Sequence, residues 1–98
     1  MAGKRSKLRK SAKGRECQIR IPGVCNGNPE TVVLCHLPGG GMGAKTHDMF
    51  GAFGCHACHD VVDGRARCNE SVDMLDIYFL EAVIRTQEIW LEEGLIHV

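Results

Sequence analysis

Six cysteines and five histidines are the side chains of this 98-residue sequence that could bind metal or transfer protons. Four of the cysteines form two pairs: Cys55-x-x-Cys58 at a predicted helix start, and Cys17 with Cys25 around a Pro-Gly turn. Four thiolates in a tetrahedron form a closed zinc site whose role is to stabilise the fold. The sequence therefore predicts a structural zinc ion on these four residues, and a set that includes a histidine of the same helix stays open as an alternative.

Two histidines and a carboxylate indicate a second, open site. His59 and Asp63 are four residues apart in a predicted helix, so their side chains share a face and could bind one divalent ion. His36 ends a predicted strand, and because histidine titrates near pH ~6.5 it could accept a proton from water. This pattern predicts a general base and a catalytic cation, separate from the thiols.

The elements that must position these residues are short, except the last. Residues 31–37 are β-branched and apolar and predict a strand, and residues 49–54 predict a return strand after a glycine-rich loop. A helical pattern runs from residue 55 to about residue 64. A longer helix is predicted over 71–94, capped by a serine and ended by a glycine. The expected fold is one α+β domain over residues 16–98.

The long helix carries apolar residues on more than one face. One stripe at helical spacing predicts contact with the core: Leu75, Phe79, Ala82, Val83 and Trp90. Further apolar residues widen that face: Tyr78, Leu80, Ile84 and Leu91. We expect the helix to cover the core, and a homodimer contact through it is the alternative.

Charge is strongly segregated although the net charge is zero. Residues 1–15 contain seven cations and no acid, and residues 70–98 contain seven acids and one cation. The basic segment predicts a flexible arm that binds DNA phosphates, with a solvated tail as the alternative. The candidate nucleic-acid contacts are Lys4, Arg5, Lys7, Arg9 and Lys10 in the arm, and Lys45, Arg65 and Arg67 beyond it.

The N-terminal sequence bears on where in the cell the protein is expected. It is basic but is not followed by an apolar segment, so we do not expect a secretory signal. The sequence contains no run of 18 or more apolar residues, so we expect no membrane span. We therefore expect a cytoplasmic protein, in which clustered cysteines bind metal more often than they form disulfides.

Three stretches, CQIRIPGVC, VLCHLPGGG and CHACHD, together resemble the motif of HNH endonucleases. Their order over about residues 8 to 98, with the C-terminal RTQEIWLEEGLI, is similar to small prophage-encoded nucleases of the YbcO type. The resemblance implies a ββα-metal, treble-clef-like hairpin stabilised by zinc, with a long C-terminal helix. It also implies a metal-dependent endonuclease that uses Mg²⁺ or another divalent ion, and that processes or recombines phage DNA in the host cytoplasm.

The resemblance assigns roles to particular residues. His36 matches the general base, His59 the metal-binding histidine and Asp63 a further ligand found in some members. The asparagine of the family name is missing, and the nearest polar candidates are Asp48 and, less favoured, His47. Asp48 would orient the base or bind metal.

One position departs from the family pattern. Cys35 stands where many members have an acidic or histidine ligand, and thiolates suit Mg²⁺ poorly, so we expect this cysteine to pack as a small apolar residue. A non-catalytic zinc module that binds nucleic acid is the alternative function. Such a module would need the thiols and the basic arm but no open site.

Overall fold

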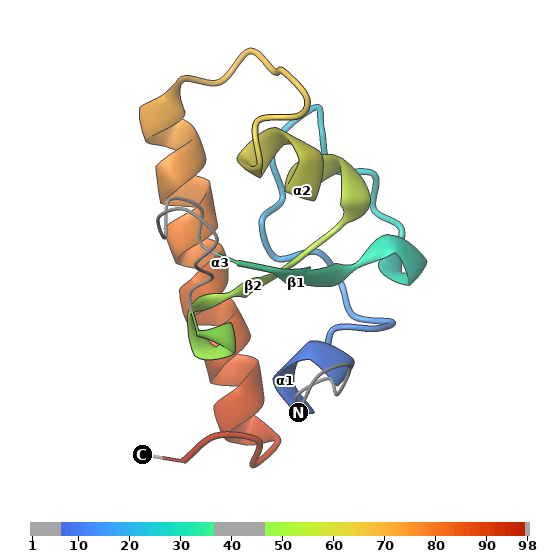
Figure 1. The fold of residues 1–98 in the computed structure, drawn as a ribbon, viewed down its shortest axis with the longest axis vertical. Helices are drawn as coiled ribbons and strands as arrows, with labels where there is room; N and C mark the ends of the chain where they lie inside the picture. The colour runs from blue at the N-terminus through green and yellow to red at the C-terminus, as the bar shows by residue number, and fades with distance from the viewer. Residues whose placement is uncertain (1–6, 37–46, 98) are drawn as a thin grey trace.

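The structure, a computed structural model, describes residues 7–36 and 47–97. One long helix runs along one side of the molecule, and the short elements lie beside it (Figure 1). In chain order these elements are α1 (Lys7–Lys10), η1 (Pro29–Thr31), β1 (Val33–Cys35), η2 (Asp48–Phe50), β2 (Ala52–Gly54), α2 (His56–Val62) and α3 (Val72–Glu92). This is the small α+β arrangement that the sequence predicts, with a two-stranded sheet and a long C-terminal helix.

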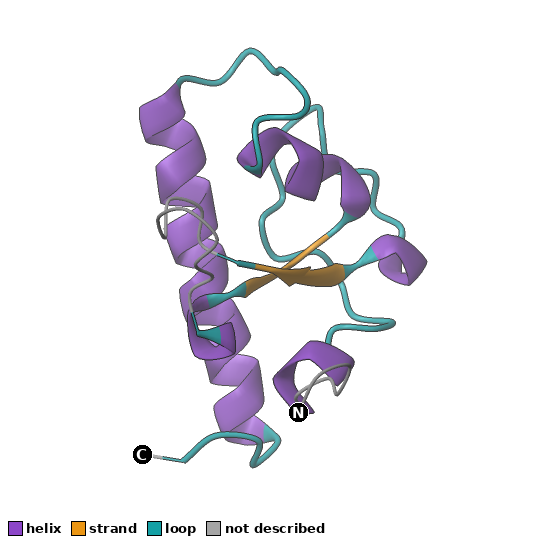
Figure 2. Ribbon diagram, viewed as in Figure 1, coloured by secondary structure: helices purple, strands orange, loops and turns teal. Residues whose placement is uncertain are grey.

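The sheet is an antiparallel hairpin of β1 and β2, in which Leu34 pairs with Phe53 (Figure 2). Both strands are shorter than predicted, because one turn of 3₁₀-helix precedes each of them. Gly54 is required at the end of β2: a Cβ there would lie 2.5 Å from Ile19 Cδ1 and 2.7 Å from Cys35 Sγ. The hairpin is therefore packed so closely that this strand position admits only a glycine without rearrangement.

Helix α3 confirms the predicted long helix almost residue for residue. Ser71 caps its first turn by accepting a hydrogen bond from the backbone N–H of Met74, and Gly94 adopts a φ of +75° just past its end. Its buried face packs on β2, with Phe53 and Trp90 edge to face at a centroid distance of 5.7 Å. Among the described helices, none combines the length and apolarity that crossing a membrane requires.

A buried hydroxyl also joins α3 to the hairpin, which the apolar stripe did not predict. Thr86 is fully buried and its Oγ1 accepts a hydrogen bond from the backbone N–H of Phe53 at 3.1 Å. In a two-stranded sheet the edge of β2 opposite β1 has no partner strand, so the threonine satisfies a backbone donor that the sheet leaves unpaired.

The N-terminal segment differs from the flexible arm expected over residues 1–15. From residue 7 onward it packs on the domain: Leu8 and Ala12 are buried, and the indole N–H of Trp90 donates to Ser11 Oγ at 2.8 Å. The physical reason is that these small and apolar side chains repeat at helical spacing between the charges and supply a buried face. The basic segment is thus part of the domain surface from α1 onward.

Candidate functional site

Four cysteine side chains converge between α2 and the segment that precedes the hairpin. The Sγ atoms of Cys17, Cys25, Cys55 and Cys58 all lie within 4.8 Å of one another, and all but Cys25 are buried. Cys55 is the N-cap of α2 and Cys58 lies in its first turn, so the helix start brings both sulfurs to one side. The four thiols could hold a metal ion, and an all-sulfur set of this kind suits zinc.

The other cysteine pair is brought together by a compact turn although seven residues separate its members. Within the turn, Arg20 adopts a positive φ of 55° and Gly23 a φ of 75°, which reverse the chain. The backbone N–H of Arg20 also lies 3.5 Å from Cys17 Sγ. Backbone donors of this type stabilise a thiolate, as a metal ligand requires.

Hydrogen bonds between the cysteine sulfurs give the thiols different pKa values. The Cys58 thiol donates to Cys17 and lowers the pKa of Cys17 to about 4, with backbone N–H groups adding to the effect. The same hydrogen bond raises the pKa of Cys58, and burial raises the pKa of Cys25. One thiolate is thus stabilised by the protein alone, while binding of a metal ion would displace the protons of the others.

The remaining two cysteines do not join this cluster in the described residues. Cys35 is fully buried in the core, where loss of solvation raises the pKa of its thiol. It therefore has the surroundings of the small apolar residue that the sequence predicts. Cys68 is half-buried against the core.

A histidine, an aspartate and an arginine meet beyond the end of β1. His36 Nε2 lies 2.6 Å from Asp48 Oδ1, and Arg9 Nε from α1 lies 3.3 Å from the same oxygen. Arg9 Nη2 also lies 3.5 Å from His36 Nε2. Because a carboxylate only accepts hydrogen bonds, a bond to Asp48 requires a proton on Nε2, and a ring with that single proton carries its lone pair on Nδ1. His47, the less favoured candidate, instead accepts from the backbone N–H of Met49 and caps η2.

Helix α2 presents a second histidine–carboxylate pair. His59 Nε2 lies 3.1 Å from Asp63 Oδ2, across one helical turn, as the sequence spacing predicts. Arg65 Nη2 donates to the same carboxylate oxygen at 2.9 Å. His56 and Asp60 form a parallel pair at 3.2 Å one turn earlier.

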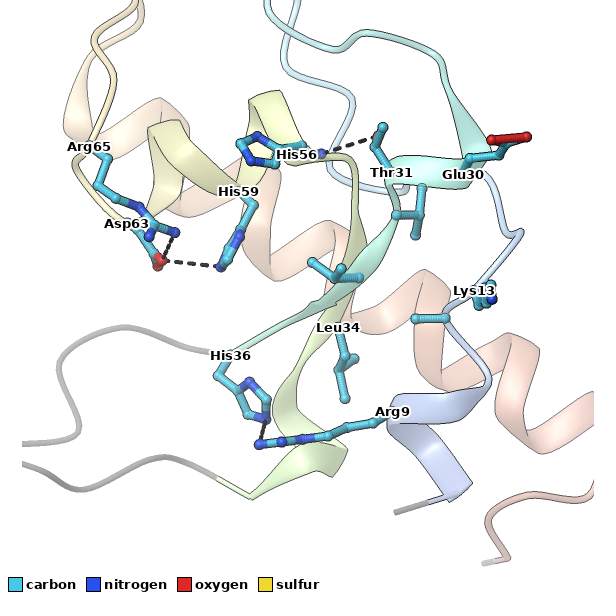
Figure 3. A pocket seen from close by; sticks show the side chains of 13 residues that line it. Arg9, Lys13, Glu30, Thr31, Leu34, His36, His56, His59, Asp63 and Arg65 are labelled. Atoms are coloured by element: carbon cyan, nitrogen blue, oxygen red, sulfur yellow. Dashed lines mark hydrogen bonds and ion pairs between the residues drawn. The ribbon is translucent and has the colours of Figure 1, made fainter. Parts of the chain in front are cut away.

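Both histidine sites open on one cavity of about 760 Å³, beside the hairpin. Figure 3 shows His36 at the end of β1, His59 and Asp63 on α2, and Arg9 reaching in from α1. The cavity is lined by Arg9, Ala12, Lys13, Glu30, Thr31, Val32, Val33, Leu34, His36, His56, His59, Asp63 and Arg65. The lining carries three cations and two carboxylates, and two further carboxylates, Asp48 and Asp60, pair with Arg9 and Arg65 just outside it.

The predicted nucleic-acid contacts separate into three groups. Arg9 and Arg65 line the cavity, whereas Lys7, Lys10 and Arg67 are exposed and lie outside its lining. Lys4, Arg5 and Lys45 lie outside the described residues.

One cavity cation, Lys13, was missed as a site residue. Its signal was the four-residue spacing from Arg9, which places two cations on one side of a short helical segment.

The predicted site for a divalent ion has fewer protein ligands than the thiol cluster. In the part of the chain that the structure describes, the four thiols are the one cluster of three or more metal-binding side chains. His59 and Asp63 therefore offer two protein ligands, and no described residue adds a third.

Comparison with known proteins gives the relationship of the chain. A family described as "Putative nuclease YbcO" matches residues 6–95. The chain belongs to the YbcO family. It is 50% identical over 92 residues to YbcO of Escherichia coli K12, a match that covers 91% of this chain and 95% of that protein. The namesake from Enterobacteria phage 82 matches with the same identity and coverage.

A solved structure has the same fold as this YbcO-family chain. It is described as a "putative bacteriophage protein" from Escherichia coli K-12, and it is 48% identical with a TM-score of 0.78. The likeness covers 90% of this chain and 100% of that one. YbcO relatives carry a nuclease name, which suggests phosphodiester hydrolysis, and a nuclease acts on nucleic acid.

Proposed function

We propose that the chain is an HNH-type, metal-dependent DNA endonuclease that processes phage DNA in the bacterial cytoplasm. The observation that carries the proposal is the cavity shared by His36 and the His59–Asp63 pair. A hydrogen-bonded imidazole beside a nitrogen and oxygen ligand pair is what hydrolysis of a phosphodiester needs. The active unit is the domain over residues 16–98 together with α1, which supplies Arg9.

His36 acts as the general base. Asp48 Oδ1 accepts a hydrogen bond from Nε2–H at 2.6 Å and so orients the ring. The other ring nitrogen, Nδ1, then takes a proton from the attacking water. The water oxygen forms a bond to phosphorus, and the bond from phosphorus to O3′ breaks. The leaving oxygen is protonated by solvent, which gives a 5′-phosphate and a 3′-hydroxyl.

His59 and Asp63 would hold the divalent ion. An imidazole nitrogen and a carboxylate oxygen from adjacent turns fit Mg²⁺ or Mn²⁺, which fill their other positions with water and phosphate oxygens. When bound, the ion supplies Lewis-acid stabilisation of the charge on the phosphate and on O3′. His59 lies in α2 and Asp63 caps its C-terminal end, and the thiol cluster holds the start of this helix in place.

The cations of the cavity bind the DNA backbone. Arg9 and Lys13 come from α1 and the turn after it, and Arg65 comes from the turn after α2, so they can contact phosphates that flank the scissile one. Such contacts provide affinity without reading bases. Zinc on the four cysteines would stabilise the fold by on the order of ten kcal/mol and leave no open position for substrate.

Nicking of supercoiled plasmid in the presence of Mg²⁺ or Mn²⁺ tests the proposal. The wild-type protein should convert supercoiled to open-circular DNA, and His36→Ala should lower the rate by at least about a hundredfold. His97→Ala is the matched control, because this histidine is exposed near the C-terminus and away from the cavity. Equal zinc content and equal thermal unfolding would show that all three proteins are folded.

The rival function is a zinc module that binds nucleic acid without cutting it. It predicts that wild type and His36→Ala are equally inert and bind DNA with equal affinity. That outcome would refute the endonuclease. It would leave the thiol cluster and the cations of the cavity as parts of a binding protein.

A further inference from the structure

Helix α3 has a second apolar face, turned away from the core. Ile77, Leu80, Ile84 and Leu91 are 46%, 55%, 60% and 41% exposed. At 3.6 residues per turn they fall within about 60° of one another, at the spacing of a helix that packs against another helix. We call these four residues the outer face of α3.

Acidic side chains border the outer face. All five are exposed along the same helix: Asp73, Asp76, Glu81, Glu88 and Glu92. The single cation of α3, Arg85, is turned toward the domain, where its Nη2 donates to the carbonyl oxygen of Gln18 at 2.6 Å. The outer face therefore combines apolar anchors with a strongly negative border.

The negative border of the outer face determines which kind of molecule could bind there. Nucleic acid is a polyanion and would be repelled. A second copy of the chain, packed with its own α3 antiparallel, would bring Glu81 and Glu88 against the same acids of its partner, which opposes pairing. A helix with an apolar stripe and flanking lysines or arginines complements both features.

We propose that the outer face of α3 is the docking site for a basic amphipathic helix of a partner protein. The site is independent of the proposed nuclease, because no residue of α3 lines the cavity. Partner and DNA can therefore be bound at once. Packing of the apolar face of an amphipathic helix on apolar anchors is a recurrent mode of helix recognition.

A designed peptide pair provides the test. One helical peptide of about 20 residues has leucines at heptad positions a and d with lysine flanks, and its matched control has glutamate flanks. Binding of each fluorescent peptide to the full, zinc-loaded chain is measured by anisotropy. The lysine peptide should bind at least about tenfold more tightly than the glutamate peptide. Exchange of Glu81 and Glu88 for lysine should reverse this preference.

Two substitutions separate docking from simple charge attraction. Ile84→Asp adds a negative charge to the outer face, so attraction alone would strengthen binding of the lysine peptide, whereas docking predicts a loss of about tenfold or more. Val72→Asp adds the same charge at an exposed apolar residue outside the face, and should leave binding unchanged or slightly tighter. Trp90 fluorescence confirms that each variant is folded.

Three outcomes would overturn the proposal. The first is equal binding of the two peptides. The second is an Ile84→Asp protein that binds the lysine peptide as well as wild type does. The third is sedimentation of the wild-type chain as a dimer that Ile84→Asp dissociates, which would identify the occupant as a second copy.

Discussion

Arg65 competes with the proposed catalytic ion for a single carboxylate. Its Nη2 donates to Asp63 Oδ2 at 2.9 Å, and the same oxygen lies 3.1 Å from His59 Nε2. An ion held by His59 and Asp63 would have to share the charge of this carboxylate with Arg65. We therefore predict that Arg65→Gln tightens binding of the divalent ion while it weakens binding of DNA.

The expected size follows from exposure. The Arg65 side chain is 61% exposed and that of Asp63 is 34% exposed, so the pair is close to a surface ion pair. Such pairs contribute about 0.2–1 kcal/mol, which corresponds to a gain of about 1.4- to 5-fold in ion affinity once Arg65 is removed. Loss of a phosphate contact should raise the KM for DNA, and the rate at saturating ion and DNA should change little.

Mn²⁺ titration of plasmid nicking measures the first effect, and electron paramagnetic resonance of free Mn²⁺ measures it without turnover. Arg67→Gln is the matched control: it removes the same charge from an exposed residue outside the cavity, and should leave Mn²⁺ affinity unchanged. If Arg65→Gln leaves Mn²⁺ affinity unchanged or weakens it, Asp63 is not a ligand. If both variants tighten Mn²⁺ equally, the effect is one of net charge.

Three further predictions concern stability. Gly54→Ala should lower the free energy of unfolding by about 1–3 kcal/mol through overpacking against buried Ile19, and urea denaturation followed by tryptophan fluorescence will show it. Cys58→Ser should release zinc, and a colorimetric chelator assay should find less than one ion per chain. Hydrogen bonding from Arg15 lowers the pKa of Glu93. Glu93→Gln should therefore lower the urea midpoint at neutral pH, and this loss should disappear as the pH falls through the lowered pKa of Glu93, because the wild-type carboxylate is then protonated as well.

Local signals predicted most of the fold. The cap at Ser71 and the glycine at Gly94 both mark the ends of α3, because helix ends are set by neighbouring residues. The four-thiol cluster was also predictable, although seven residues separate Cys17 from Cys25. Turn residues allow that spacing, since a chain reversal rather than a fixed short gap brings the sulfurs together.

The packing of the N-terminal segment could not be predicted in the same way. Its charge density is typical of a solvated arm, and the helical spacing of Leu8 and Ala12 is a pattern of only two residues. What holds it is a partner far away in the chain, the indole of Trp90. For the same reason the cavity could not be predicted from the sequence. Arg9 lines it only when α1 is docked on α3, and local sequence does not predict contacts between distant segments.

The hydrogen bond between Ser11 and Trp90 spans 79 positions of the chain and ties its beginning to its last helix. A ribosome makes the basic segment before the indole, so α1 has nothing to dock on until α3 has been synthesised. The wall of the cavity that carries Arg9 can form only once α3 is in place. Chains that end before Trp90 should therefore lack an assembled cavity.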